Sequence, residues 1–120
     1  MAKNLEITIL LDFYGEMLTE KQRSFLIYYY DDDLSLSEIA ENEGITRQGV
    51  RDAIQRAQAQ LYDMEEKLGM VKRFDEVKEA LGEIIECADK ISEINMNTAL
   101  SRDINDTTVK IKAIAQSLMD

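Results

Sequence analysis

Two helix-start signals and one glycine outline a helix, a tight turn and a second helix in the middle of this chain. Ser35 and Thr46 are residue types that accept hydrogen bonds from the first-turn amides of a helix, and Glu38 completes a capping box with Ser35. Gly44 occupies the place where a helix commonly ends in a left-handed residue. These signals predict a short helix, a two-residue turn and a long helix from Thr46 to Gly69, which is the layout of a helix-turn-helix.

The long helix is predicted to be amphipathic. At about 100° per residue its apolar side chains fall on one arc roughly 100° wide. They are Ala53, Met64, Ala57, Val50, Leu68, Leu61 and Ile54. The chain has no proline and only five glycines, so long uninterrupted helices are favoured. The expected fold class is therefore all-α.

The N-terminal third has one ambiguous segment and one clear helix start. Residues 1–18 show both an alternating pattern typical of a strand and a helical face, and helix is favoured because no partner strand follows. Thr19 and Gln22 form a capping box that opens the next helix. The three carboxylates of residues 31–33 oppose the helix dipole at its expected end.

The C-terminal half is predicted to hold two more helices. One runs from Val71 to about Glu93 and the last covers the end of the chain, with a polar stretch at residues 95–105 between them. The first has apolar residues at heptad spacing, with Ile85 widening the stripe, and the last carries a set of residues on one side. They are Phe74, Val77, Leu81, Ile84, Ile85, Ala88 and Ile91 in the first helix, and Ile104, Thr108, Ile111, Ala115 and Leu118 in the second.

These elements predict two parts. Residues 1–68 form a helix-turn-helix domain with its N-terminal helix packed on a core motif at about residues 35–62. Residues 70–120 form a helical extension whose apolar stripe is too large for so short a segment to bury alone. We expect it to pack on the first domain, on a second subunit or on both, and a homodimer is favoured.

Composition excludes several classes of chemistry. With no histidine and a single cysteine, zinc sites, disulfide frameworks and Ser-His-Asp catalysis are ruled out. No cofactor loop or nucleophile accompanies the carboxylates, so we expect no enzyme activity, no metal and no cofactor. Cys87 lies among aliphatic residues and is expected to be a buried, inert thiol. No apolar run approaches the number of residues needed to span a bilayer, so we expect no membrane insertion. We expect a cytoplasmic location.

The first turns of the long helix carry the candidate binding residues. In helix-turn-helix proteins this part of the second helix enters the major groove, where Arg suits guanine and Gln suits adenine. The candidates are Arg47, Gln48, Arg51, Gln55 and Arg56. Charge opposes this interpretation, because the chain has 14 basic and 24 acidic residues and a net charge of −10. Direct DNA binding and contact with a protein or an RNA-bearing particle therefore both stay open.

Two further clusters have a plain and a functional interpretation. The three tyrosines of residues 28–30 point about 100° apart on a helix, so they serve mainly as core or interface, while one exposed ring could stack on a base. The carboxylates of residues 31–33 could bind Mg²⁺ or Ca²⁺, but consecutive carboxylates do not converge, and a solvated turn is favoured.

The segment from residue 18 to residue 61 resembles the fourth-region domain of bacterial sigma factors. The matching residues are Leu18, Thr19, Gln22, Arg23, Ser35, Glu38, Ile39, Ala40, Thr46, Arg47, Val50 and Arg51. Residues 5–75 are similar to the YlxM-like family of bacterial helix-turn-helix proteins. That likeness rests on Leu11 to Tyr14, Leu18 to Arg23, Tyr28 to Tyr30, Ser37 to Ala40, Thr46 to Val50 and Glu66 to Gly69.

The resemblance implies an all-α, sigma-four-like domain with helical additions. It also implies a regulatory link to the signal recognition particle pathway, with the particle's protein or RNA as partner and no catalytic residue to assign. The alternative is a DNA-binding transcriptional regulator. The chain departs from DNA-binding sigma domains in its acidity and in Gly49, which presents bare backbone inside the recognition helix and costs about 1 kcal/mol relative to Ala.

Overall fold

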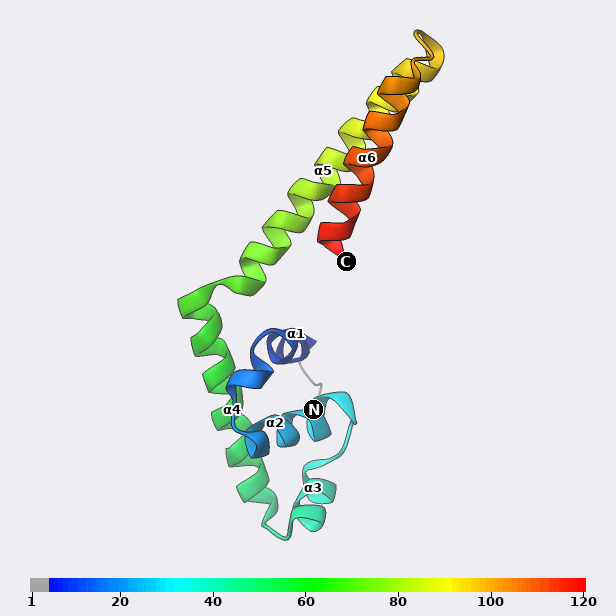
Figure 1. Ribbon diagram of the computed structural model, residues 1–120. Coiled ribbons are helices and arrows are strands. Elements are labelled where there is room, and N and C mark those ends of the chain that lie inside the picture. Colours follow the sequence, from blue (N-terminus) through cyan, green and yellow to red (C-terminus); the bar gives the residue numbers. More distant parts are fainter. Residues whose placement is uncertain (1–4) are drawn as a thin grey trace. The chain divides into compact units, whose positions relative to one another are not determined.

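The computed structural model describes residues 5–120, which form two compact units that divide after Val71 (Figure 1). All regular structure in residues 5–120 is helical, which confirms the all-α class. No helix among these residues is long and apolar enough to span a bilayer. Each unit is described separately below.

The first unit is built from short helices around one long helix. The elements are α1 (Leu5–Tyr14), the 3₁₀ turn η1 (Gly15–Met17), α2 (Glu20–Leu26), the π-helical turn η2 (Ile27–Asp31), α3 (Leu36–Glu43) and α4 (Arg47–Leu68). The ambiguous N-terminal segment is helical from Leu5, as favoured. Within the unit, α1, α2 and α3 all pack against α4 (Figure 1).

The predicted helix starts are confirmed by hydrogen bonds. Thr19 Oγ1 accepts from the Gln22 amide at 3.2 Å, and the Gln22 side chain accepts from the Thr19 amide at 3.1 Å. Ser35 and Glu38 form the same reciprocal pair. Because each pair satisfies two amides that a helix end leaves unpaired, these local signals could be recognised without tertiary information.

The core of the first unit combines the inward face of α4 with residues from every shorter element. Fully buried side chains include Tyr14, Phe25, Ile39 and Leu61. The arc predicted for α4 is buried at Val50, Ile54, Ala57 and Leu61, but Leu68 at its end is 54% exposed. Fully burying one aliphatic or aromatic side chain of this size stabilises a fold by about 1.5–3 kcal/mol, so this face anchors α4.

The end of α4 and the first turn of α5 (Met70–Asn97) are joined by a hydrogen-bond network inside the first unit. The Tyr14 hydroxyl donates to Glu65 Oε1 at 2.6 Å and accepts from the Met70 amide at 3.1 Å. Glu65 Oε1 also accepts from the Val71 amide at 3.0 Å. These contacts satisfy two first-turn amides of α5. Burial, followed by the bond to the Glu65 carboxylate, raises the pKa of Tyr14 above its ordinary value of 10.0.

The second unit is a hairpin of two helices, the remainder of α5 and α6 (Arg102–Met119), which run antiparallel (Figure 1). Their contact includes small and polar residues besides Leu81. Ser92 Oγ donates to Thr108 Oγ1 at 2.8 Å, and Lys112 pairs with Asp89 at 2.9 Å. The buried positions of this unit are Leu81, Ala88, Asn95, Thr108 and Ala115.

Two predictions for the second unit are wrong. Helix α5 continues to Asn97 rather than stopping near Glu93, because the Asn95 side chain exchanges two 2.9 Å hydrogen bonds with the backbone of Ser101 and closes the turn there. Cys87 is exposed, because it lies on α5 away from the seam with α6.

Candidate nucleic-acid interface

The start of α4 is set by two adjacent devices. Gly44 adopts φ +68°, a left-handed conformation that L-residues with a Cβ avoid, and this sharp bend ends α3. Thr46 Oγ1 then accepts from the Gly49 amide at 2.9 Å and begins α4. The short turn brings α3 against α4 and leaves the outward side of the first α4 turns exposed.

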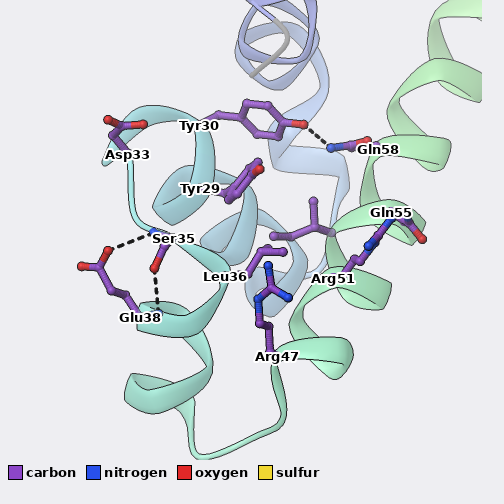
Figure 2. Close-up of a pocket in the computed structure, with 11 residues that line it drawn as sticks. Tyr29, Tyr30, Asp33, Ser35, Leu36, Glu38, Arg47, Arg51, Gln55 and Gln58 are labelled. Carbon is purple, nitrogen blue, oxygen red and sulfur yellow. Dashed lines mark hydrogen bonds between the residues drawn. The ribbon is translucent and has the colours of Figure 1, made fainter. Parts of the chain in front are cut away.

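A hollow of about 600 Å³ lies between η2, the start of α3 and this part of α4 (Figure 2). Tyr29 and Tyr30 of η2 line one side, Ser35, Leu36 and Glu38 another, and α4 supplies the third. The α4 residues are Arg47, Arg51, Ile54, Gln55 and Gln58. Asp33 completes the lining. The hollow therefore joins two guanidiniums and two amides to an aromatic and aliphatic floor, with carboxylates across from them.

The π-helical turn η2 places the tyrosines of the hollow. Its last bond runs from the Asp32 amide to the Ile27 carbonyl at 2.9 Å, which is the wider i+5 spacing. Tyr29 is buried, whereas Tyr30 is half-buried and its hydroxyl accepts a hydrogen bond from Gln58 of α4 (Figure 2). Burial raises the pKa of Tyr30, with smaller contributions from Tyr29 and Tyr62, so this hydroxyl stays neutral at physiological pH.

Arg47 and Arg51 are exposed, and their guanidinium groups are not engaged in ion pairs with described residues. They stand one helical turn apart on α4, and among residues 5–120 neither forms an ion pair with a carboxylate. Two unpaired guanidiniums on one helix face present forked donors to the planar or tetrahedral anions that arginine binds in two-pronged fashion. This is the feature that a binding role requires of them.

The structure divides the five predicted binding residues. Arg47, Arg51 and Gln55 line the hollow, but Arg56 lies on a different side of α4, in a second hollow with Lys21 and Phe25 of α2. The Lys21 ammonium is 5.8 Å from the Phe25 ring centroid. Gln48 is exposed and donates to Asp52 Oδ1 at 3.0 Å, so its amide already has a partner on its own helix.

The sequence pointed to α4 but missed the remainder of the hollow. Gln58 and Leu36 line the hollow because α3, α4 and η2 pack together, and the sequence gives no local signal for that contact. A π-helical turn has no local sequence signature comparable to a helix cap. The direction in which the Tyr30 side chain points could therefore not be predicted from α-helical spacing. Across residues 5–120 no group of three His, Cys, Asp or Glu side chains is arranged to hold a metal ion, the carboxylates of residues 31–33 included.

Comparisons with known proteins place the chain among bacterial helix-turn-helix proteins. The sequence profile of the family described as "Putative helix-turn-helix protein, YlxM / p13 like" matches residues 1–100. A UPF0122 protein of Acetivibrio thermocellus is 40% identical over 117 residues, covering 98% of this chain and 100% of the relative. The UPF0122 protein YlxM of Bacillus subtilis is 43% identical, covering 83% and 91%. A Caldanaerobacter subterraneus relative is 49% identical, covering 69% and 71%. The chain therefore belongs to the YlxM / p13-like helix-turn-helix family.

Proposed function

We propose that this chain is a non-enzymatic accessory protein of the signal recognition particle pathway, and that Arg47, Arg51 and Gln55 of α4 contact a protein or RNA component of the particle. The observation that supports it is the pair of exposed guanidiniums without ion-pair partners at the start of the second helix-turn-helix helix. The link to the particle itself is supported by the resemblance to the YlxM-like family.

The charge distribution favours a short, local contact. The chain carries a net charge of −10, so the wider surface repels a polyanion, and only the α4 guanidiniums oppose that repulsion in the hollow. Two phosphate contacts predict that the logarithm of affinity falls with the logarithm of salt concentration with a slope of about −1.4 to −1.8. Duplex-binding regulators that make six to ten phosphate contacts show far steeper slopes.

A DNA-binding transcriptional regulator is the second candidate. It is supported by the exposure of Arg47, Gln48 and Arg51 on the turns of α4 that a helix-turn-helix offers to the major groove. A dimer would double the number of these contacts while doubling the net negative charge.

Titration of the full chain against three probes separates these candidates. The probes are the particle RNA, the particle GTPase and a mixed-sequence DNA duplex, and each titration is repeated at 50, 100 and 200 mM salt. The proposal expects saturable binding to the RNA or the GTPase that is tighter than binding to the duplex. Tighter binding to the duplex with a steep salt slope supports the second candidate, and binding to none of the three contradicts both.

Two arginine variants test the contact surface. The double variant Arg47→Ala with Arg51→Ala is expected to weaken binding by at least tenfold, because each charge-assisted hydrogen bond contributes about 1.5–3 kcal/mol. Arg56→Ala removes another exposed arginine from a different side of the same helix and is the control, with less than a twofold effect expected. Equal losses in both proteins would show that net charge, and not this surface, determines binding.

A further inference from the structure

The α5–α6 hairpin leaves one regular row of large aliphatic side chains half-exposed on each helix. On α5 the row is Val77, Ile84 and Ile91, which are 36–46% exposed. On α6 it is Ile104, Ile111 and Leu118, of which Ile104 and Leu118 are 39% and 61% exposed and Ile111 is half-buried. Both rows step by seven residues, so each forms a straight stripe along its helix.

The two stripes belong to the same side of the hairpin. Ile91, Ile104 and Ile111 line one shallow hollow of about 270 Å³, together with Asp103, Thr107 and Thr108, which brings the α5 row beside the α6 row. Because the helices are antiparallel and both rows keep the heptad step, the remaining members continue the same side away from the turn. We call these six residues the apolar face. All six are aliphatic, and Asp103 is the one charged residue that lines the hollow beside them.

The hairpin covers the apolar face only in part. The seam between α5 and α6 is made from the adjacent heptad position, at Leu81, Ala88 and Asn95 on α5 and Thr108 and Ala115 on α6. Leu81 is the only large aliphatic residue among them, so the seam buries little apolar area. A two-helix hairpin has no third layer of its own to cover the larger residues.

We propose that the apolar face binds the apolar face of a second copy of this chain, so that the two hairpins form a four-helix bundle. Self-association is favoured because the six members of the face are uncharged in a chain of net charge −10, and Asp103 is the only carboxylate that lines the hollow between them. A face of this form is also self-complementary, as a two-fold interface requires.

The exposed area is sufficient for a dimer. From the fractional exposures, the apolar face and the neighbouring Ile94 and Ile114 leave on the order of 600 Å² uncovered per copy, or about 1,200 Å² for two copies, which reaches the lower bound of stable interfaces. The heptad step on both helices gives the knobs-into-holes spacing of bundle packing. The inference rests on this geometry and is independent of the proposed function of α4.

The mass of the full chain in solution tests the proposal. Light scattering and sedimentation at micromolar concentrations are expected to give twice the 13.8 kDa of one chain. A monomeric mass at 100 μM contradicts the proposal.

Matched substitutions locate the interface. Ile91→Glu places a charge at the centre of the apolar face and is expected to raise the dissociation constant at least a hundredfold, giving the monomer mass at 10 μM. Val109→Glu introduces the same charge on α6 at a site that is 53% exposed, outside the apolar face and its two neighbours, and should leave a dimer. Dissociation by both variants, or by neither, overturns the assignment of this face.

Helix content distinguishes loss of the interface from loss of the fold. The Ile91→Glu monomer is expected to keep its far-ultraviolet helical signal at 10 μM, because Ile91 is not part of the buried seam. If that variant unfolds, the milder Ile84→Ser replaces it, with at least a tenfold rise in the dissociation constant expected. An unchanged dissociation constant for a folded Ile84→Ser protein contradicts the proposal.

Discussion

The cap of α4 and the glycine three residues later are predicted to be energetically coupled. A Cβ added at Gly49 would lie 3.1 Å from Thr46 Oγ1, the atom that accepts the Gly49 amide bond at 2.9 Å. Alanine is about 1 kcal/mol better than glycine inside a helix, whereas loss of a threonine cap costs about 1 kcal/mol. Moving the hydroxyl aside to admit the Cβ weakens the cap, so the two effects of Gly49→Ala oppose each other.

A double-mutant cycle measures this coupling. In the natural background Gly49→Ala should change the free energy of unfolding by less than about 0.5 kcal/mol, because the helix gain offsets the weakened cap. In a Thr46→Ala background the oxygen is gone, and the same substitution should stabilise by about 0.5–1 kcal/mol.

Urea unfolding followed by tyrosine fluorescence is a suitable assay. All five tyrosines fall within residues 1–71 and there is no tryptophan, so the signal reports the unit that contains α4. Additive effects of the two substitutions, within about 0.3 kcal/mol, would refute the steric argument.

Three further predictions concern other positions. Gly44→Ala should destabilise the first unit by about 1–2 kcal/mol in the same assay, because φ is +68° there although a Cβ would meet no neighbour; a neutral effect would contradict this. Gly82→Ala, in the interior of α5 with open space for a Cβ, should instead stabilise the second unit by about 0.5–1 kcal/mol in thermal melts followed by circular dichroism, and a lower melting temperature would count against it. The raised pKa of Tyr14 contributes stability that is fully present below pH 10 and is lost as pH rises through the folded-state pKa. In urea titrations at alkaline pH, the difference in unfolding free energy between the natural chain and Tyr14→Phe should therefore shrink. A constant difference from pH 8 to 11.5 would exclude that role.

Local signals predicted the helix boundaries of the first unit closely. The caps at Thr19, Ser35 and Thr46 and the left-handed Gly44 act through neighbours within four residues, so their chemistry is visible in the sequence. The end of α5 had no such signal. There the chain turns with Leu100 at φ +48°, a residue type that gives no warning of a left-handed conformation.

The candidate site could be predicted only in part, because it depends on tertiary contacts. Helical spacing placed Arg47, Arg51 and Gln55 outside the core, and the structure brings them together in one hollow. The same spacing did not separate Arg56, since a polar arc spans most of the helix surface and only the position of α2 divides it. The exposure of Cys87 was missed for a similar reason, because heptad spacing does not reveal which side of the stripe faces the partner helix.

The bonds that hold the first turn of α5 have a consequence for biosynthesis. Helix α5 has no serine or threonine of its own at its start, and its first amides depend on the side chains of Tyr14 and Glu65 instead. A ribosome releases both of these residues before it releases α5, and domains tend to fold in that N-to-C order. In the nascent chain, the side chains of Tyr14 and Glu65 can thus already be in place to accept hydrogen bonds from the first amides of α5. A fragment that begins after residue 71 would lack both acceptors.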